Sequence, residues 1–199
     1  MATDHVVLAT RNQGKLNELA RILSCQISLA GLDAFPDAPD VPETGATFEA
    51  NALLKARAVV GYTNLPAVAD DSGLCVDALN GMPGVLSARW AGQHGDDQAN
   101  LDLLLAQIAD VPDARRGARF VCAAALVVPT GCEWVVTGQV EGRLIRTPRG
   151  SGGFGYDPIF QPDGFTETTA EMTPDAKDAI SHRGRAFRAL APFITGRPT

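Results

Sequence analysis

The chain has 199 residues, 45% hydrophobic and 20% charged, as in an ordinary globular protein of one domain. Its 17 basic and 23 acidic residues leave a net charge of −6, which argues against sequence-independent nucleic-acid binding, because such binding needs many cations opposite the phosphates. The sequence shows neither an apolar run near the ~20 residues of a membrane span nor a signal peptide. We therefore expect a cytoplasmic protein without membrane or nucleic-acid partners.

The first half of the chain alternates apolar runs with helical patterns. Leucine and isoleucine recur at helical spacing in residues 15–23, and Thr44 is a plausible N-cap for the next helix. We predict a strand at 5–9, a helix at 15–23, a proline-rich loop at 31–42, a helix at 46–60, a strand at 65–69, a turn at 70–73 and a short strand at 74–79.

The second half predicts helices around an antiparallel pair of strands. Asp96 or Asp97 is expected to cap a helix, Thr173 and Pro174 to begin another, and Ser181 to cap the last. Long strands are predicted at 120–128 and 134–145, joined by a turn at 129–131. Mixed strands and helices in this order indicate an α/β or α+β fold around one mixed sheet.

Four cysteines, Cys25, Cys75, Cys122 and Cys132, lie in or beside apolar segments without paired spacing. This pattern favours buried thiols in a reducing compartment over a disulfide framework.

Residues 150–160 read GSGGFGYDPIF and form the most informative segment. The spacing of Gly150, Gly152 and Gly155 formally matches the dinucleotide-binding fingerprint, but that motif must open a helix. Pro158 disfavours helical backbone before it, so we expect an extended segment and reject the fingerprint. The remaining alternatives are a glycine-rich turn with an aromatic plug and a base-binding site. Such a site has flat rings in Phe154 and Tyr156, and polar groups in Asp157, Lys177, His182 and Arg183.

Residues 10–15, TRNQGK, lie where the first strand passes to the first helix. Backbone N–H groups and the helix dipole attract anions there, and Thr10, Asn12 and Lys15 add donors and charge. The P-loop pattern is absent. The segment is either a phosphate site or an ordinary turn capped by Asn12.

Asp70 and Asp71 follow an apolar strand, and Glu43 precedes a predicted helix. Carboxylate oxygens suit Mg²⁺ better than zinc, because the three histidines are scattered and no cysteines are paired. The alternative is a pair of solvated or capping aspartates. Lys55 and Arg57 face either solvent or phosphates.

Together these segments resemble the inosine-triphosphate pyrophosphatase family. The matching stretches occur in the family's order, namely VVLATRNQGKLNEL (6–19), ETGATFEANALLKAR (43–57), PAVADDSGLCVDALNGMPGVLSARWAG (66–92), GSGGFGYDPIF (150–160) and TAEMTPDAKDAISHRGRAF (169–187). The resemblance implies one domain over 1–199, with an elongated mixed sheet in two lobes flanked by helices and an active-site cleft between the lobes. It also implies a homodimer that uses Mg²⁺ to hydrolyse ITP, dITP and XTP to the monophosphate and pyrophosphate.

The resemblance also implies roles for individual residues. Asp71 would be the catalytic carboxylate and a metal ligand, with Asp70 and Glu43 in the same metal shell. The substrate-binding residues would be Thr10, Arg11, Asn12, Gln13, Gly14, Lys15, Ser72, Phe154, Gly155, Tyr156, Asp157, Lys177, His182 and Arg183. Arg11 departs from the small residue of many relatives, and either contacts a phosphate or points to solvent.

Two other functions remain open at this point. A nucleotide- or RNA-binding module would stack and clamp a base without hydrolysing it. A pyrophosphatase directed at ordinary or pyrimidine nucleotides would share the chemistry but not the base preference.

Overall fold

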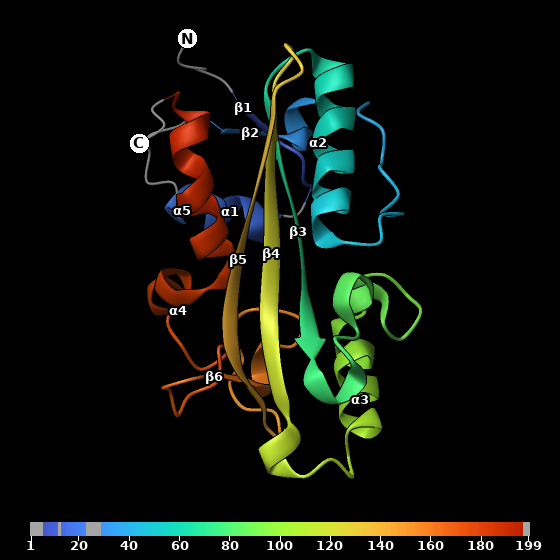
Figure 1. Cartoon of the computed structure of the whole chain (residues 1–199), viewed down its shortest axis with the longest axis vertical. Helices are drawn as coiled ribbons and strands as arrows, with labels where there is room; N and C mark the ends of the chain where they lie inside the picture. The colour runs from blue at the N-terminus through green and yellow to red at the C-terminus, as the bar shows by residue number, and fades with distance from the viewer. Residues whose placement is uncertain (1–5, 12, 23–28, 197–199) are drawn as a thin grey trace. The chain divides into compact units, whose positions relative to one another are not determined.

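The computed structural model describes residues 6–11, 13–22 and 29–196, and contains a six-stranded mixed sheet with helices beside it (Figure 1). The sheet order is β2-β1-β3-β4-β5-β6, in which β1 is parallel to β2 and β3, and β5 is antiparallel to β6. The strands are β1 Val6–Leu8, β2 Leu29–Gly31, β3 Ala67–Val76, β4 Gly117–Val127, β5 Glu133–Leu144 and β6 Phe160–Pro162. The helices are α1 Gln13–Ile22, α2 Phe48–Thr63, α3 Asp97–Gln107, α4 Pro174–Ile180 and α5 His182–Ile194. The predicted α/β class is confirmed. Within the described ranges, no helix has the length and apolar character that a bilayer crossing requires.

The chain divides into two compact units. Unit 1 comprises residues 1–71, 122–138 and 183–199, and unit 2 comprises residues 72–121 and 139–182. Strands β3, β4 and β5 each begin in one unit and end in the other. Both units are therefore built from segments that are distant in sequence.

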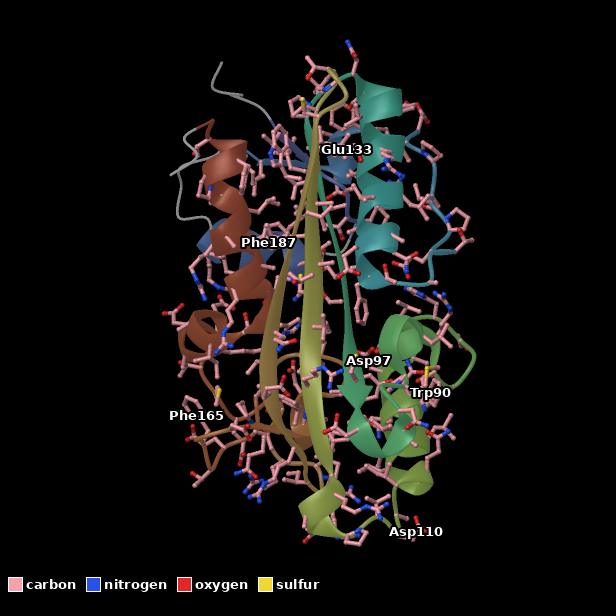
Figure 2. All side chains as sticks on the ribbon, viewed as in Figure 1. Trp90, Asp97, Asp110, Glu133, Phe165 and Phe187 are labelled. Atoms are coloured by element: carbon pink, nitrogen blue, oxygen red, sulfur yellow. The ribbon has the colours of Figure 1, made fainter. Side chains whose placement is uncertain are left out.

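In unit 1, helices cover both faces of the strands, and side-chain alternation sorts the apolar residues between them. Val6, Leu8 and Val68 pack in a cluster with Leu19 of α1 and Phe187 of α5. The neighbouring residues Val7 and Ala67 point to the opposite face, where they pack in a different cluster with Val59 of α2. Figure 1 shows α2 on one side of the strands and α1 and α5 on the other, and Figure 2 labels Phe187 on α5.

Unit 2 has its own apolar core. It is formed by the second half of β3, by α3, by parts of β4 and β5, and by the segment that follows the glycine-rich loop. Its buried members include Leu74, Val76, Leu101, Leu104, Ile108, Phe120, Leu144, Tyr156, Ile159 and Phe160. The predicted start of α3 is confirmed, because Asp96 caps it by accepting a hydrogen bond from the Ala99 N–H.

Several local predictions are corrected. The expected turn at Asp70–Gly73 does not exist, since β3 runs unbroken from Ala67 to Val76. Helix α2 is capped by Thr47 and not by Thr44. Strand β2 was not predicted, and it ends at Gly31, the first residue of the region predicted as loop. Residues Asp157–Ile159 form one 3₁₀ turn instead of an extended segment.

The prediction for the cysteines holds in part. Cys75 and Cys122 are buried, Cys132 is exposed in the turn between β4 and β5, and none of these three forms a disulfide. Cys25 lies outside the described residues.

Candidate active site

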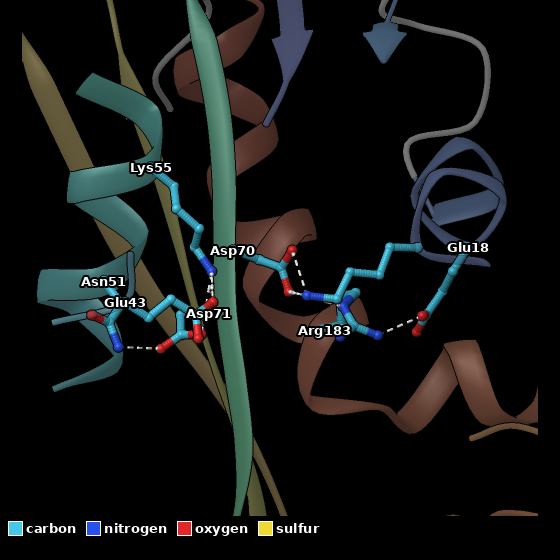
Figure 3. A network of polar contacts seen from close by, with 8 residues as sticks. Glu18, Glu43, Asn51, Lys55, Asp70, Asp71 and Arg183 are labelled. Carbon is cyan, nitrogen blue, oxygen red and sulfur yellow. Dashed lines mark hydrogen bonds and ion pairs between the residues drawn. The ribbon is translucent and has the colours of Figure 1, made fainter. Parts of the chain in front are cut away.

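The two adjacent aspartates of β3 point to opposite faces of the strand, because successive side chains in a strand alternate. Asp71 is four residues from Ala67, so it faces the same side of β3, toward α2. Asp70 is two residues from Val68, so it faces the other side, toward α1 and α5. Figure 3 shows this separation, with Asn51 and Lys55 on one side of β3 and Arg183 and Glu18 on the other. Both carboxylates are buried, with 3% and 5% of Asp70 and Asp71 exposed.

On the α2 face, two helical side chains hold Asp71. Asn51 donates from Nδ2 to Asp71 Oδ2 at 2.9 Å, and Lys55 Nζ lies 3.3 Å from Asp71 Oδ1 and 2.8 Å from Glu43 Oε1. The orientation of the Asn51 amide follows from Gly45, whose N–H donates to Asn51 Oδ1 at 2.7 Å. A side chain at Gly45 would collide with that oxygen, since an added Cβ would lie 2.7 Å from it.

Burial controls the ionisation of this face. It raises the pKa of Asp71 above the ordinary value, and the positive charge of Lys55 opposes the shift. Burial alone would lower the pKa of Lys55, but the charges of Asp71, Asp70 and Glu43 outweigh it, so the pKa of Lys55 is raised. Lys55 therefore stays charged, and Asp71 is a stronger proton acceptor than an exposed aspartate.

On the opposite face, Asp70 contacts two cations. Lys15 Nζ of α1 lies 3.3 Å from Asp70 Oδ2, and Arg183 Nε of α5 donates to the same oxygen at 3.3 Å. Arg183 is 2% exposed and also donates from Nη1 to Glu18 Oε2 at 2.5 Å. Burial would lower the pKa of Arg183, but Asp70 and Glu18 outweigh it, and the net pKa is raised. Arg183 is thus a charged group held between two carboxylates.

In the described part of the chain, the ion pairs around β3 join three cations to four carboxylates. The cations are Lys15, Lys55 and Arg183, and the carboxylates are Glu18, Glu43, Asp70 and Asp71. Among the described residues, no group of three or more histidine, cysteine, aspartate or glutamate side chains is arranged to hold a metal ion by itself. Glu43 and Asp71, however, share one ammonium group, so their oxygens converge on a point that already attracts a cation.

The turn after β1 is only partly described. Thr10 is half-buried, and its N–H donates to Leu8 O at 2.8 Å. Asn12 and the side chain of Gln13 lie outside the described residues, and of Gly14 only the helical backbone is described. Arg11 is exposed, and its side chain lies along the 36–40 loop, because Nη2 donates to Ala38 O at 2.7 Å and Nε approaches Asp40 at 3.4 Å. Arg11 thus anchors the 36–40 loop.

In unit 2, the buried carboxylate of Asp157 organises the glycine-rich loop. Its Oδ2 accepts hydrogen bonds from the Phe154 N–H at 2.9 Å and from Lys177 Nζ at 2.5 Å, and its Oδ1 accepts from Thr169 Oγ1 at 2.7 Å. Gly153 permits this approach, since an added Cβ there would collide with Asp157 Oδ2. Lys177 Nζ also lies 5.3 Å from the centre of the Phe154 ring, within cation–π range.

The two aromatic rings of this loop differ in exposure. The Phe154 ring is accessible, with 44% of the residue exposed, whereas Tyr156 is buried in the core and its hydroxyl donates to Ser87 O at 2.9 Å. Burial raises the pKa of Tyr156. The stacking surface predicted from two rings is therefore corrected to Phe154 alone. His182 is buried and stacked on Phe120, with ring centres 5.0 Å apart.

Comparison with known proteins identifies the family. Residues 6–193 match the Ham1 family. The chain belongs to the Ham1 family. This family match, together with relatives named dITP/XTP pyrophosphatase, confirms the resemblance to inosine-triphosphate pyrophosphatases.

Individual Ham1 relatives match over nearly their full length. A Streptomyces coelicolor protein named dITP/XTP pyrophosphatase is 64% identical over 192 residues, covering 95% of this chain and 96% of its own. A crystal structure titled nucleoside-triphosphatase / dITP/XTP pyrophosphatase from Mycobacterium abscessus has a TM-score of 0.79 at 60% identity, covering 94% of this chain and 99% of that one. The structure of the Staphylococcus aureus Ham1 protein has a TM-score of 0.87 at 40% identity, covering 98% of this chain and 100% of that one.

Sequence reasoning missed two residues of the site, Asn51 and Glu18, and left open whether Lys55 faces solvent or phosphates. Asn51 and Lys55 are one helical turn apart, so they share a face of α2, and the side of the sheet which that face meets was not apparent from the pattern. Glu18 lies three residues after Lys15, so the two share a face of α1. This spacing was the only local signal that Glu18 lies near the site, where it pairs with Arg183. Arg57 instead pairs with Glu133 at the surface, at 2.6 Å.

Proposed function

We propose that this chain hydrolyses dITP, XTP and ITP to the nucleoside monophosphate and pyrophosphate with Mg²⁺, and so removes deaminated purines from the nucleotide pool. The observation that carries the proposal is Asp71, a buried carboxylate with a raised pKa that is fixed by Asn51 and lies beside Lys55. Relatives up to 64% identical are named dITP/XTP pyrophosphatase, which supports the choice of reaction and bases.

The donor set around Asp71 fits Mg²⁺. Mg²⁺ is typically held by one or two protein carboxylates, with water and substrate phosphates completing its shell. Glu43 and Asp71 supply two carboxylates that already converge on a cationic group. We no longer assign Asp70 to the same shell, because its carboxylate lies on the other face of β3 with Lys15 and Arg183. When bound, the metal neutralises phosphate charge and lowers the pKa of a coordinated water.

Residues of the protein carry out proton transfer, charge stabilisation and positioning of the triphosphate. The Asp71 carboxylate accepts a proton from the attacking water, whose oxygen bonds to the α-phosphorus while the α–β bridging oxygen departs with pyrophosphate. Lys55, beside Asp71, stabilises the negative charge that develops on the phosphates. Lys15 lies with Asp70 on the other face of β3, so its phosphate contact stays a prediction from the family resemblance. Thr10, Ser72 and the backbone of residues 11–14 are proposed to position the triphosphate at the start of α1.

Base recognition is assigned to the glycine-rich loop and its neighbours. The exposed face of Phe154 offers a stacking surface, with Gly155, Asp157 and Lys177 around it. Hypoxanthine and xanthine present a 6-oxo acceptor where adenine presents an amino donor, so cationic donors such as Lys177 and Arg183 favour the former. With adenine, the protein donor would face the amino donor of the base, and the hydrogen bond would be lost. His182 and Tyr156 support this region from the core.

The homodimer and a cleft between two lobes stay predictions from the family resemblance, and the cytoplasmic location stays a prediction from the sequence composition and patterning.

Pyrophosphate release from a panel of nucleotides tests the proposal. With Mg²⁺ we expect dITP and XTP to be hydrolysed faster than dGTP, dATP and dTTP, and EDTA to abolish release. Preference for dATP or dTTP would instead identify a pyrophosphatase for ordinary nucleotides. Absence of release from every nucleotide would identify a binding module.

Asp71→Asn is the decisive variant within this assay. We expect turnover to fall by at least ~10³-fold, because the amide neither accepts the proton nor holds the metal with a full charge. Circular dichroism should show an unchanged fold. Arg57→Ala is a matched control from α2, since Arg57 pairs with Glu133 at the surface and leaves Asp71 untouched. Wild-type turnover in Asp71→Asn would remove this residue from the mechanism.

A further inference from the structure

The direction of the Phe154 ring depends on the backbone that carries it. The residue is 44% exposed and lies in a glycine-rich loop, and Lys177 Nζ lies 5.3 Å from the ring centre. Lysine is itself a flexible side chain with several rotatable bonds. Constraints on the backbone at the Phe154 Cα therefore contribute to the direction of the ring.

Two carboxylates hold the peptide groups on either side of the Phe154 Cα. Asp157 Oδ2 accepts a hydrogen bond from the Phe154 N–H at 2.9 Å, which belongs to the preceding peptide plane. Asp97 Oδ2 accepts one from the Gly155 N–H at 2.8 Å, which belongs to the following plane. Because a residue has only two soft backbone dihedrals, anchoring both planes restricts the conformation of Phe154.

The anchor at Asp97 matters because the glycines beside Phe154 allow many conformations. Gly153 and Gly155 have φ values of +73° and +61°, in the left-handed region. A Cβ at Gly155 would meet nothing within 4 Å, so steric packing does not fix that position. The Asp97 carboxylate therefore supplies a constraint that the loop lacks.

Asp97 is well placed to act as a fixed point. It lies in the first turn of α3, where Figure 2 labels it, and is 58 residues away from Gly155 in sequence. Helix α3 is itself anchored, since Asp96 caps its N-terminus and Leu101 and Leu104 are buried in the core of unit 2. Because α3 is held by the core, the hydrogen bond from the Gly155 N–H to Asp97 holds the exposed loop at a fixed place.

We propose that Asp97 is a positioning residue for base binding: through Gly155 it fixes the backbone that aims the Phe154 ring. This inference rests on the proposed function, in which Phe154 stacks on the purine. Asp97 acts through Phe154 and does not itself touch the substrate. Stacking is present in both the ground state and the transition state, so its loss raises KM and leaves kcat nearly unchanged.

Asp97→Ala tests the proposal in steady-state hydrolysis of dITP. Loss of one charge-assisted hydrogen bond at the loop should raise KM roughly threefold to tenfold, with kcat within about twofold of wild type. Asp97→Asn keeps an oxygen acceptor for the Gly155 N–H and should restore most of the wild-type KM. An unchanged KM in Asp97→Ala, or no rescue by Asp97→Asn, overturns the inference.

Asp96→Ala is the matched control at the neighbouring position. It removes the cap to the Ala99 N–H but leaves the bond from Asp97 to Gly155 in place. The midpoint of urea unfolding should fall while KM stays at the wild-type value. An equal rise of KM in Asp96→Ala and Asp97→Ala would assign the effect to the stability of α3 and contradict a positioning role.

A double-mutant cycle with Phe154→Ala separates this inference from the proposed function. If Asp97 acts through the ring, Asp97→Ala should add nothing to KM once Phe154 is removed. Additive effects would overturn the positioning role, even while pyrophosphate release from dITP and a raised KM in Phe154→Ala uphold the proposed function. Absence of pyrophosphate release by the wild type would instead reject both.

Discussion

Arg183 illustrates how burial changes the role of a charged side chain. Its guanidinium is 2% exposed and bonds to both Glu18 and Asp70, each of which is buried as well. Exposed ion pairs contribute little to stability, but removing one partner of a buried pair leaves an uncompensated charge in a medium of low polarity. The same residue that we assign to base recognition is therefore also a structural element of unit 1.

Arg183→Ala should destabilise the protein by about 3–5 kcal/mol, because it leaves two buried carboxylates with one fewer cation. Urea unfolding at pH 7, followed by circular dichroism, measures the change. Arg185→Ala on the same helix is the control, since Arg185 is exposed and the contacts of an exposed arginine contribute at most about 1 kcal/mol. Equal, small effects of the two substitutions would contradict a buried ionic network.

At the scale of elements, α2 shows how one helix serves both folding and the site. Ala52, Ala56 and Val59 are buried, while Asn51 and Lys55 reach Asp71 from an adjoining stripe of the same helix. Both groups of side chains depend on a stable first turn of α2. Its cap is Thr47, whose side chain accepts a hydrogen bond from the Ala50 N–H at 3.2 Å.

Substitutions of two threonines near this terminus should differ in effect. Thr47→Ala removes an N-cap acceptor and should cost about 1 kcal/mol of unfolding free energy. Thr44→Ala lies three residues earlier at an exposed position and should stay within about 0.5 kcal/mol of wild type. Chemical denaturation of both variants measures the difference. A larger loss in Thr44→Ala would restore the cap that the sequence pattern suggested.

At the scale of the whole molecule, the two units are linked through shared strands. The chain passes between them within β3, within β4, within β5 and again between His182 and Arg183. Neither unit is a continuous piece of chain, so unfolding of one removes the strand ends on which the other depends. We infer that the two units unfold together.

The two tryptophans report on this cooperativity, because Trp90 belongs to unit 2 and Trp134 to unit 1. In the single-tryptophan variants Trp134→Phe and Trp90→Phe, fluorescence-detected urea transitions should each coincide with the transition by circular dichroism. Comparing the two probes within one variant cancels any change in stability that the substitution causes. A fluorescence transition that precedes the circular dichroism transition in either variant would show that the units unfold separately.

The sequence by itself determined the α/β class, the helices α1, α2 and α3 to within a few residues, and the family, because apolar periodicity and five motifs in order are local properties of the chain. It also predicted which residues carry the chemistry, and those roles stay predictions. It did not predict that β3 runs through Asp70 and Asp71, since two adjacent aspartates are typical of a turn and only burial against cations on both faces makes them compatible with a strand.

Only the tertiary structure decided which of these groups meet. Strand alternation sends Asp71 to Lys55 and Asp70 to Arg183, and packing buries Tyr156 while leaving Phe154 exposed. The contact between Asp97 and Gly155 joins residues 58 positions apart, for which the chain contains no local signal. Such pairings depend on how helices pack against a sheet, and that packing is set by the whole core.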